Sequence, residues 1–187
     1  MATFEFFRAR QSTTGSPEPP PTLAGFPAMP HHDIFDRLIQ DHDMHRDLFA
    51  RLAAPGADRA ALFERLTREL KAHAAAEEQA LYSSTMRKPA LTEETRHSVA
   101  EHKEIEDLLN DLAATDLATD AWDAKFAHLR HRYLHHIDEE EEENFPAFAR
   151  VLTDDDVQHM RAVFERRKQA ERAHAEVTPE KLEDAKQ

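Results

Sequence analysis

Histidine and glutamate are the residues of this sequence whose spacing could support chemistry. The chain has 13 His and no Cys in 187 residues, so a metal held by this protein would need nitrogen and oxygen ligands. Two His-x-x-x-Glu segments stand out, one beginning at His73 and one at His136. Because residues four apart lie on the same face of a helix, each segment can direct an imidazole and a carboxylate at one point.

The periodicity of the apolar residues indicates which elements position these segments. The sequence predicts long helices over about 33–52, 58–82, 93–113 and 120–145, and a shorter one over about 154–174. Short connections make neighbouring helices antiparallel. The expected fold is therefore all-α, an antiparallel up-down-up-down four-helix bundle with a short fifth C-terminal helix. Pro146 is expected to kink or end the fourth helix.

Each of the four long helices carries at least one histidine in phase with its apolar stripe. These residues are His42, His73, His102 and His136. The pair His135 and Glu139 is the alternative on the fourth helix, but its phase matches polar residues, which favours His136 and Glu140. The acidic run 138–143 is expected to be mostly solvated, with Glu140 and, as a second candidate, Glu143 pointing inward.

Two glutamates in the core of a bundle need compensating positive charge, which neutral imidazoles cannot supply and metal ions can. Imidazole together with carboxylate suits iron, with manganese and zinc as competitors, and two carboxylates have enough oxygens to bridge a metal pair. The predicted metal ligands are His42, His73, Glu77, His102, His136 and Glu140. His45 lies one turn from His42 on the same face, and two roles stay open for it: an extra ligand, or a residue that supports the ligands.

The combined pattern resembles the hemerythrin-like (HHE cation-binding) domains, whose signature reads H…HxxxE…H…HxxxE. The resemblance covers about residues 33–150, and the matching stretches are 38–42, 73–82, 101–105 and 135–146. It implies two iron ions with an oxo or hydroxo bridge, the four histidines as terminal ligands, and Glu77 and Glu140 as bridging ligands. It also implies an exchangeable position for dioxygen, peroxide or nitric oxide.

The sequence departs from the respiratory hemerythrins at Glu106, which stands where a second histidine would follow His102 by four residues. Loss of that ligand would open the iron and favour redox turnover over stable oxygen carriage. Three functions therefore remain: a binding or sensing module for a diatomic or peroxide, an enzyme that decomposes hydrogen peroxide or reduces nitric oxide, and a metal-stapled structural or iron-storage bundle. Tyr82 and Tyr133 are candidate proton or electron donors for the enzyme.

Composition and the chain ends narrow the remaining possibilities. A net charge of -13 argues against nucleic-acid binding. The sequence has no apolar run long enough for a membrane span and no secretion signal, so cytoplasmic residence is the default expectation. We expect a flexible Pro-rich N-terminal arm over 1–30, the bundle over 31–150, and the C-terminal helix and tail over 151–187. Aromatic residues near the start of the arm are a candidate contact with the body or with a second copy in a homodimer; they are Phe4, Phe6 and Phe7.

Overall fold

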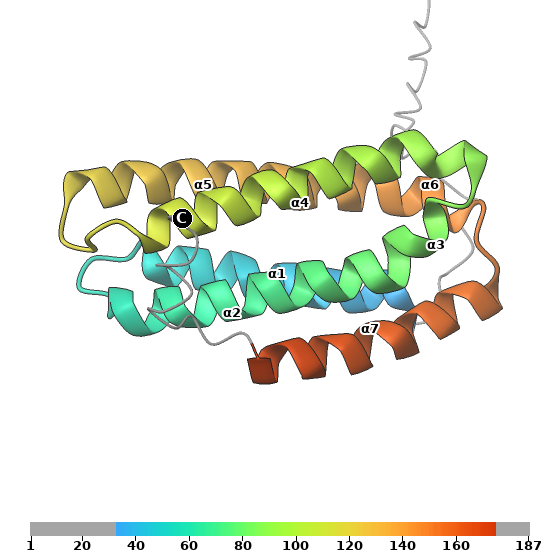
Figure 1. Cartoon of the computed structure of the whole chain (residues 1–187), viewed down its shortest axis with the longest axis horizontal. Coiled ribbons are helices and arrows are strands. Elements are labelled where there is room, and N and C mark those ends of the chain that lie inside the picture. The colour runs from blue at the N-terminus through green and yellow to red at the C-terminus, as the bar shows by residue number, and fades with distance from the viewer. Residues whose placement is uncertain (1–32, 175–187) are drawn as a thin grey trace, which may run out of the picture.

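The computed structural model describes residues 33–174, and every regular element in that range is helical (Figure 1). The five long helices are α1 (Ile34–Leu52), α2 (Arg59–Glu77), α4 (Thr92–Ala113), α5 (Asp120–Glu139) and α7 (Asp154–His174). The short elements are α3 (Ser83–Thr85), α6 (Phe145–Ala149), a 3₁₀ turn η2 (Pro89–Leu91) and two π-helical turns, η1 (Glu78–Tyr82) and η3 (Glu140–Asn144).

Side-chain caps fix where three of the long helices begin. Asp33 accepts a hydrogen bond from the Asp36 backbone N–H at 2.9 Å, and Asp58 and Thr119 cap α2 and α5 in the same way. Each cap satisfies a donor that the first turn of a helix leaves free. Gly56, in the turn between α1 and α2, has a φ of 74°, a conformation that glycine adopts without steric cost.

The π-helical turns lie at equivalent places in α2 and α5. Each begins at the site glutamate or directly after it: η1 follows Glu77, and η3 begins at Glu140. A π turn inserts an extra residue into the helical repeat and shifts the phase of everything after it. Pro146 lies in the first turn of α6, where its missing N–H costs little, so the π turn and not the proline marks the break in α5.

The helices form three layers (Figure 1). The pair α4 and α5 lies on one side, α1 and α2 lie in the middle, and α7 runs along the outer face of α1 and α2. The predicted antiparallel four-helix bundle with an additional C-terminal helix is confirmed. The fifth helix has the predicted bounds, Asp154–His174, and its 21 residues compare with 19 in α1.

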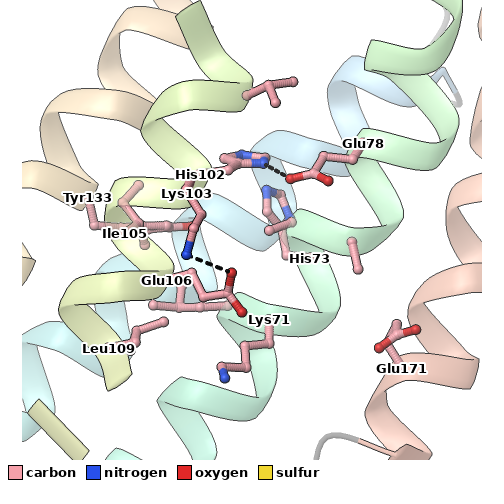
Figure 2. A pocket seen from close by; sticks show the side chains of 14 residues that line it. Lys71, His73, Glu78, His102, Lys103, Ile105, Glu106, Leu109, Tyr133 and Glu171 are labelled. Atoms are coloured by element: carbon pink, nitrogen blue, oxygen red, sulfur yellow. Dashed lines mark hydrogen bonds and ion pairs between the residues drawn. The ribbon is translucent and has the colours of Figure 1, made fainter. Parts of the chain in front are cut away.

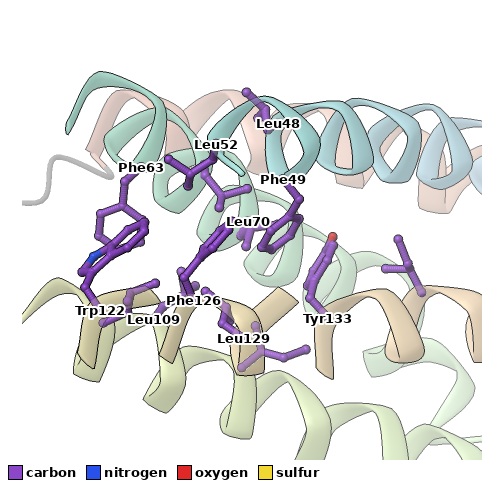
Figure 3. Packing of buried hydrophobic residues seen from close by; sticks show 14 residues of the cluster. Leu48, Phe49, Leu52, Phe63, Leu70, Leu109, Trp122, Phe126, Leu129 and Tyr133 are labelled. Carbon is purple, nitrogen blue, oxygen red and sulfur yellow. The ribbon is translucent and has the colours of Figure 1, made fainter. Parts of the chain in front are cut away.

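Two apolar clusters fill the interior and leave a polar layer between them. One cluster, at the end where α1 leads into α2, is drawn in Figure 3 and contains Phe49, Phe63, Trp122 and Phe126 among its buried residues. The other lies toward the opposite end and includes Phe35. On α1, for example, residues 48–52 contribute to the cluster around Phe49 and residues 34–38 to the cluster around Phe35. The two histidines of α1 lie between these segments.

The predicted N-terminal arm and the last part of the predicted tail lie outside the described residues. The assignment of the N-terminal aromatics to a body or dimer contact therefore stays a prediction. None of the described helices is both long and apolar enough to cross a membrane.

Candidate metal centre

The six predicted site residues come together in the polar layer between the two apolar clusters. All are buried, with exposed fractions between 0% and 6%. They come from four helices: His42 from α1, His73 and Glu77 from α2, His102 from α4, and His136 and Glu140 from α5 and its π-helical continuation. Residues selected by their spacing on separate helices therefore lie together in the folded bundle.

Glu77 connects two of these helices. Its Oε2 atom lies 3.3 Å from Nε2 of His73 and 3.5 Å from Nε2 of His102. His73 belongs to the same helix four residues earlier, whereas His102 reaches the carboxylate from α4. One carboxylate therefore faces two imidazole nitrogens that lie on different elements.

Glu140 makes the complementary connection. Its Oε2 lies 3.4 Å from Nε2 of His42, and its Oε1 lies 3.5 Å from Nε2 of His136. The histidine rings themselves form two close pairs, His42 with His73 at 5.1 Å between centroids and His102 with His136 at 4.8 Å. Each carboxylate consequently faces one histidine from each ring pair, which is the arrangement that two bridging carboxylates would need.

The other ring nitrogen of every site histidine is held by an acidic side chain from a neighbouring helix. Since a carboxylate only accepts, each Nδ1 donates, and the lone pair is left on Nε2, which faces the centre. The pairs close into a ring that runs from α1 to α2, α4, α5 and back to α1. They are Asp41 with His73 (3.1 Å), Glu78 with His102 (3.1 Å), Glu101 with His136 (2.9 Å) and Glu141 with His42 (2.8 Å).

Burial makes the charges of this centre costly. Burial and the neighbouring charge of Glu77 raise the pKa of Glu140 well above its ordinary value. Burial would likewise raise the pKa of Glu77 and lower that of His73, but the hydrogen bond of His73 to Asp41 and its pairing with the Glu77 carboxylate reverse both directions. Without a cation in the centre, a proton on His73 therefore compensates the charge of Glu77, and a metal ion would take the place of that proton. Burial lowers the pKa of His136 to about 4, which keeps the imidazole neutral, the form that binds a metal.

Several polar atoms in the centre have no hydrogen-bond partner among the described residues. They are Nε2 of His42, Nε2 of His73, both carboxylate oxygens of Glu77 and Oε2 of Glu140. Buried polar atoms without partners are rare and expensive. Cations would satisfy all of them at once, and the donor set of imidazole nitrogens and carboxylate oxygens fits a metal pair. His102 and His136 each offer one ring nitrogen, and Glu140 offers one carboxylate oxygen. These three atoms lie within 4.8 Å of one another, close enough to bind one ion.

His45 lies beside the centre. It is fully buried, its ring packs at 5.1 Å from that of His73, and its Nδ1 lies 2.5 Å from the hydroxyl of Tyr133. Its Nε2 has no partner among the described residues. No carboxylate oxygen of the centre lies within 4 Å of that atom, unlike the Nε2 atoms of the four site histidines. This geometry favours a supporting role for His45.

Tyr82 is the other buried tyrosine at the centre. It lies in η1 and donates its hydroxyl proton to Oε1 of Glu140. Burial and the charges of Glu140 and Glu77 raise the pKa of the Tyr82 phenol well above 10, so the hydroxyl keeps its proton. The contact links the π turn of α2 to that of α5.

The structure decides between the alternatives on the fourth helix. His135 is 56% exposed and Glu139 is 23% exposed, whereas His136 and Glu140 are buried. Glu143 is exposed, so the second inward candidate in the acidic run is wrong. The residue beyond Glu140 that faces inward is Asn144, one position later than Glu143, as an extra residue in a π turn requires. In the same run Glu141, directly after Glu140, holds His42.

The four outer carboxylates were missed by the phase argument, although the sequence does contain a signal for them. Each stands next to a predicted site residue in the chain. The adjacent pairs are Asp41-His42, Glu77-Glu78, Glu101-His102 and Glu140-Glu141. An acidic residue beside a site residue points sideways along the helix surface, toward the neighbouring helix.

Comparison with known proteins places the chain in a family. The model of the hemerythrin HHE cation-binding domain matches residues 33–148. Among solved structures, the chain is similar to a hemerythrin HHE cation-binding domain-containing protein of Mycobacterium kansasii, with 25% identity over 76% of this chain and 88% of that chain, and a TM-score of 0.67. No curated protein sequence matches the chain. The matched domain spans both His-x-x-x-Glu segments and all four helices of the bundle, and the chain belongs to the hemerythrin family of HHE cation-binding domains.

Proposed function

We propose that this chain binds two iron ions at the centre and that the dimetal site binds a small ligand: dioxygen, peroxide or nitric oxide. In this proposal the four site histidines are terminal ligands, and Glu77 and Glu140 bridge the ions. The observation that carries it is the cross-connection of the ring pairs, since each carboxylate faces one histidine of each pair. When bound, iron supplies Lewis-acid and redox chemistry.

The protein residues have defined tasks in this proposal. The outer carboxylates hold the Nδ1 protons and so keep every Nε2 lone pair directed at the centre. Tyr82 holds a proton on its hydroxyl and directs it at Oε1 of Glu140, which limits how that carboxylate can rotate. The two apolar clusters keep water from reaching the layer along the bundle axis, which strengthens the electrostatic interactions inside the layer.

Metal analysis of His136→Ala tests the ligand set, and His135→Ala is the matched control. The two histidines are adjacent, but His136 is buried in the centre and His135 is 56% exposed. Iron-loaded wild-type protein and the His135→Ala variant should hold two ions per chain and show the near-ultraviolet absorption of a bridged ferric pair. His136→Ala should hold fewer than two. Wild-type protein without any bound metal, or two ions retained in His136→Ala, would contradict the proposal.

Decomposition of hydrogen peroxide or reduction of nitric oxide is a second candidate function. The two buried tyrosines favour it, because each holds a proton beside the centre: Tyr82 against Glu140, and Tyr133 against His45 at 2.5 Å. The iron-loaded protein should then evolve oxygen from hydrogen peroxide, and Tyr82→Phe should slow this without loss of iron. A stable oxygen-dependent absorption band without turnover would favour reversible binding. If the iron-loaded protein neither binds nor converts dioxygen, hydrogen peroxide or nitric oxide, the metal has a structural role.

A further inference from the structure

A cavity of about 430 Å³ lies between α2 and α4 and reaches the candidate metal centre (Figure 2). His73 and His102 line it from the two helices, and both appear in the close-up with their side chains in the cavity. Tyr133 from α5 also lines it. A second pocket lies on α7, and none of the site histidines line it.

The cavity joins this centre to solvent. Its rim consists of exposed or half-exposed charged residues, including Glu78, Lys103 and Glu106. Its inner lining is buried, and His102 has the largest exposed fraction of the six site residues, 6%. Solvent therefore approaches the centre most closely at His102. Glu106, which stands where respiratory hemerythrins would place a further histidine, belongs to this rim.

The walls determine which molecules could pass. The apolar part of the lining includes half-buried Ala74 and Ala75 on α2, and half-buried Val99 and buried Ile105 on α4. An anion would have to give up hydration against such walls, whereas a neutral molecule pays no comparable cost. The rim lysines are already engaged, Lys71 with Asn110 at 3.1 Å and Lys103 with Asp107. Asn110 is neutral, so Lys71 keeps its charge, but the cavity lining sets three glutamates, Glu78, Glu106 and Glu171, against these two lysines. The charge at the rim therefore does not favour entry of an anion.

We propose that this cavity is the route by which a neutral molecule of two to four atoms reaches the metal centre, and that it arrives on the His102 side. The proposal rests on the proposed function for the identity of the ligand. Glu78 lies at the opening of this route and is held in place by few contacts. It lies at the rim with 46% of its side chain exposed, and the hydrogen bond to His102 is its one partner among the described residues.

Ala74→Leu tests the route, with Ala100→Leu as the matched control. Both replace an alanine in a helix, which is a mild change for the backbone, but Ala74 lines the cavity and Ala100 is exposed on α4 outside it. With iron content unchanged, association of nitric oxide with the reduced protein, followed by stopped-flow absorbance, should slow at least tenfold in Ala74→Leu. In Ala100→Leu it should stay at the wild-type rate. Val99→Phe narrows the cavity from the opposite wall and replaces Ala74→Leu if that variant does not fold.

A second readout does not depend on iron. Diethyl pyrocarbonate is neutral but larger than the proposed ligands, so it tests whether the opening of the cavity reaches His102. It should modify His102 of the metal-free protein faster than the fully buried His42, as followed by peptide mass spectrometry. Ala74→Leu should remove this preference. Equal nitric oxide rates in the wild type and in Ala74→Leu, or equal modification of His102, would overturn the route. Failure of iron-loaded wild-type protein to bind nitric oxide, with His102 still modified first, would overturn the proposed function and leave the route standing for another ligand.

Discussion

His73 and His102 face the same carboxylate, but the acids that hold their outer nitrogens lie in very different surroundings. Asp41, which holds His73, has a side chain that is 4% exposed and is also bonded by Arg37 at 2.6 Å and by Lys168 from α7. Glu78, which holds His102, is 46% exposed and has no lysine or arginine partner among the described residues. The centre therefore has a closed side under α7 and an open side toward the cavity.

The closed side depends on a buried lysine. Lys168 is 1% exposed, and its ammonium group lies against Asp41 and 3.7 Å from Glu69, while the ring of Phe164 packs on His73 at 5.8 Å. A buried ion pair is weak evidence for stability in itself, but it fixes one arrangement of its partners. Through Asp41, α7 fixes the orientation of His73, so the fifth helix belongs to the metal centre as much as to the fold.

Replacing Lys168 should have the largest effect. In Lys168→Met, the buried carboxylates of Asp41 and Glu69 lose a shared cation, and breaking a buried pair of this kind typically costs about 3–5 kcal/mol. The free energy of unfolding from urea titration of the metal-free protein measures it. The control Lys103→Met removes an exposed lysine on the open side and should leave that free energy unchanged. Equal losses in the two variants would mean that the two sides do not differ.

The two outer acids should differ in their influence on metal binding. Loss of such a partner typically weakens metal affinity by about 10–100-fold. We expect Asp41→Asn to weaken metal affinity by about 100-fold, because it also leaves Arg37 and Lys168 without their carboxylate. Glu78→Gln should weaken metal affinity by about 10-fold or less, because water can replace an exposed partner. Competition of each variant with a chelator for Fe²⁺ measures both, and a larger loss in Glu78→Gln would reverse the comparison.

The acid sensitivity of the closed side follows from Asp41. Burial would raise the pKa of this carboxyl, but the hydrogen bond to His73 and the charge of Lys168 outweigh it and hold the pKa well below its ordinary value. The stability that Asp41 contributes is therefore present above about pH 4, the value in the unfolded chain, and is lost as the pH falls below it. Urea titrations of metal-free protein between pH 5 and pH 3 should show a steep loss.

Asp41→Asn supplies the control for this pH dependence. Without the carboxyl, the slope of unfolding free energy against pH should be smaller by up to about 1.4 kcal/mol per pH unit in this window. An unchanged slope would mean that other carboxylates carry the acid sensitivity, and that Asp41 is no more tightly held than its counterparts.

The features of the fold and of the metal centre that depend on local interactions could be predicted from the sequence. The positions of the helices and the convergence of the six site residues follow from the periodicity of single helices. Spacings of four within one helix gave Glu77 and Glu140, because that geometry does not depend on the rest of the fold. The ring of outer carboxylates depends on contacts between helices, which periodicity does not describe. Adjacency to a site residue marks these acids as candidates, but the partner of each is a histidine on another helix. The inward position of Asn144 in place of Glu143 needed in addition the π turn, for which the run of glutamates gives no sign.

Lys168 is an intermediate case. It continues the apolar stripe of α7 at spacings of four, after Met160 and Phe164, so the pattern marks it as facing inward. A lysine at such a position is ordinarily read as a side chain that reaches back to solvent. Only the placement of α7 over Asp41 and Glu69 shows that its charge stays inside.

Arg172 should have the smallest effect, although its geometry resembles that of Lys168. Its guanidinium donates to Oε2 of Glu69 at 2.5 and 2.9 Å, but 42% of its side chain is exposed. Water can take over much of what the pair contributes, so Arg172→Gln should cost about 0.5–1 kcal/mol of unfolding free energy and leave metal content at the wild-type level. Urea titration and metal analysis measure both. A loss as large as that of Lys168→Met would place the anchor of the closed side at Glu69 and not at Asp41, because Glu69 is the acid that both cations share.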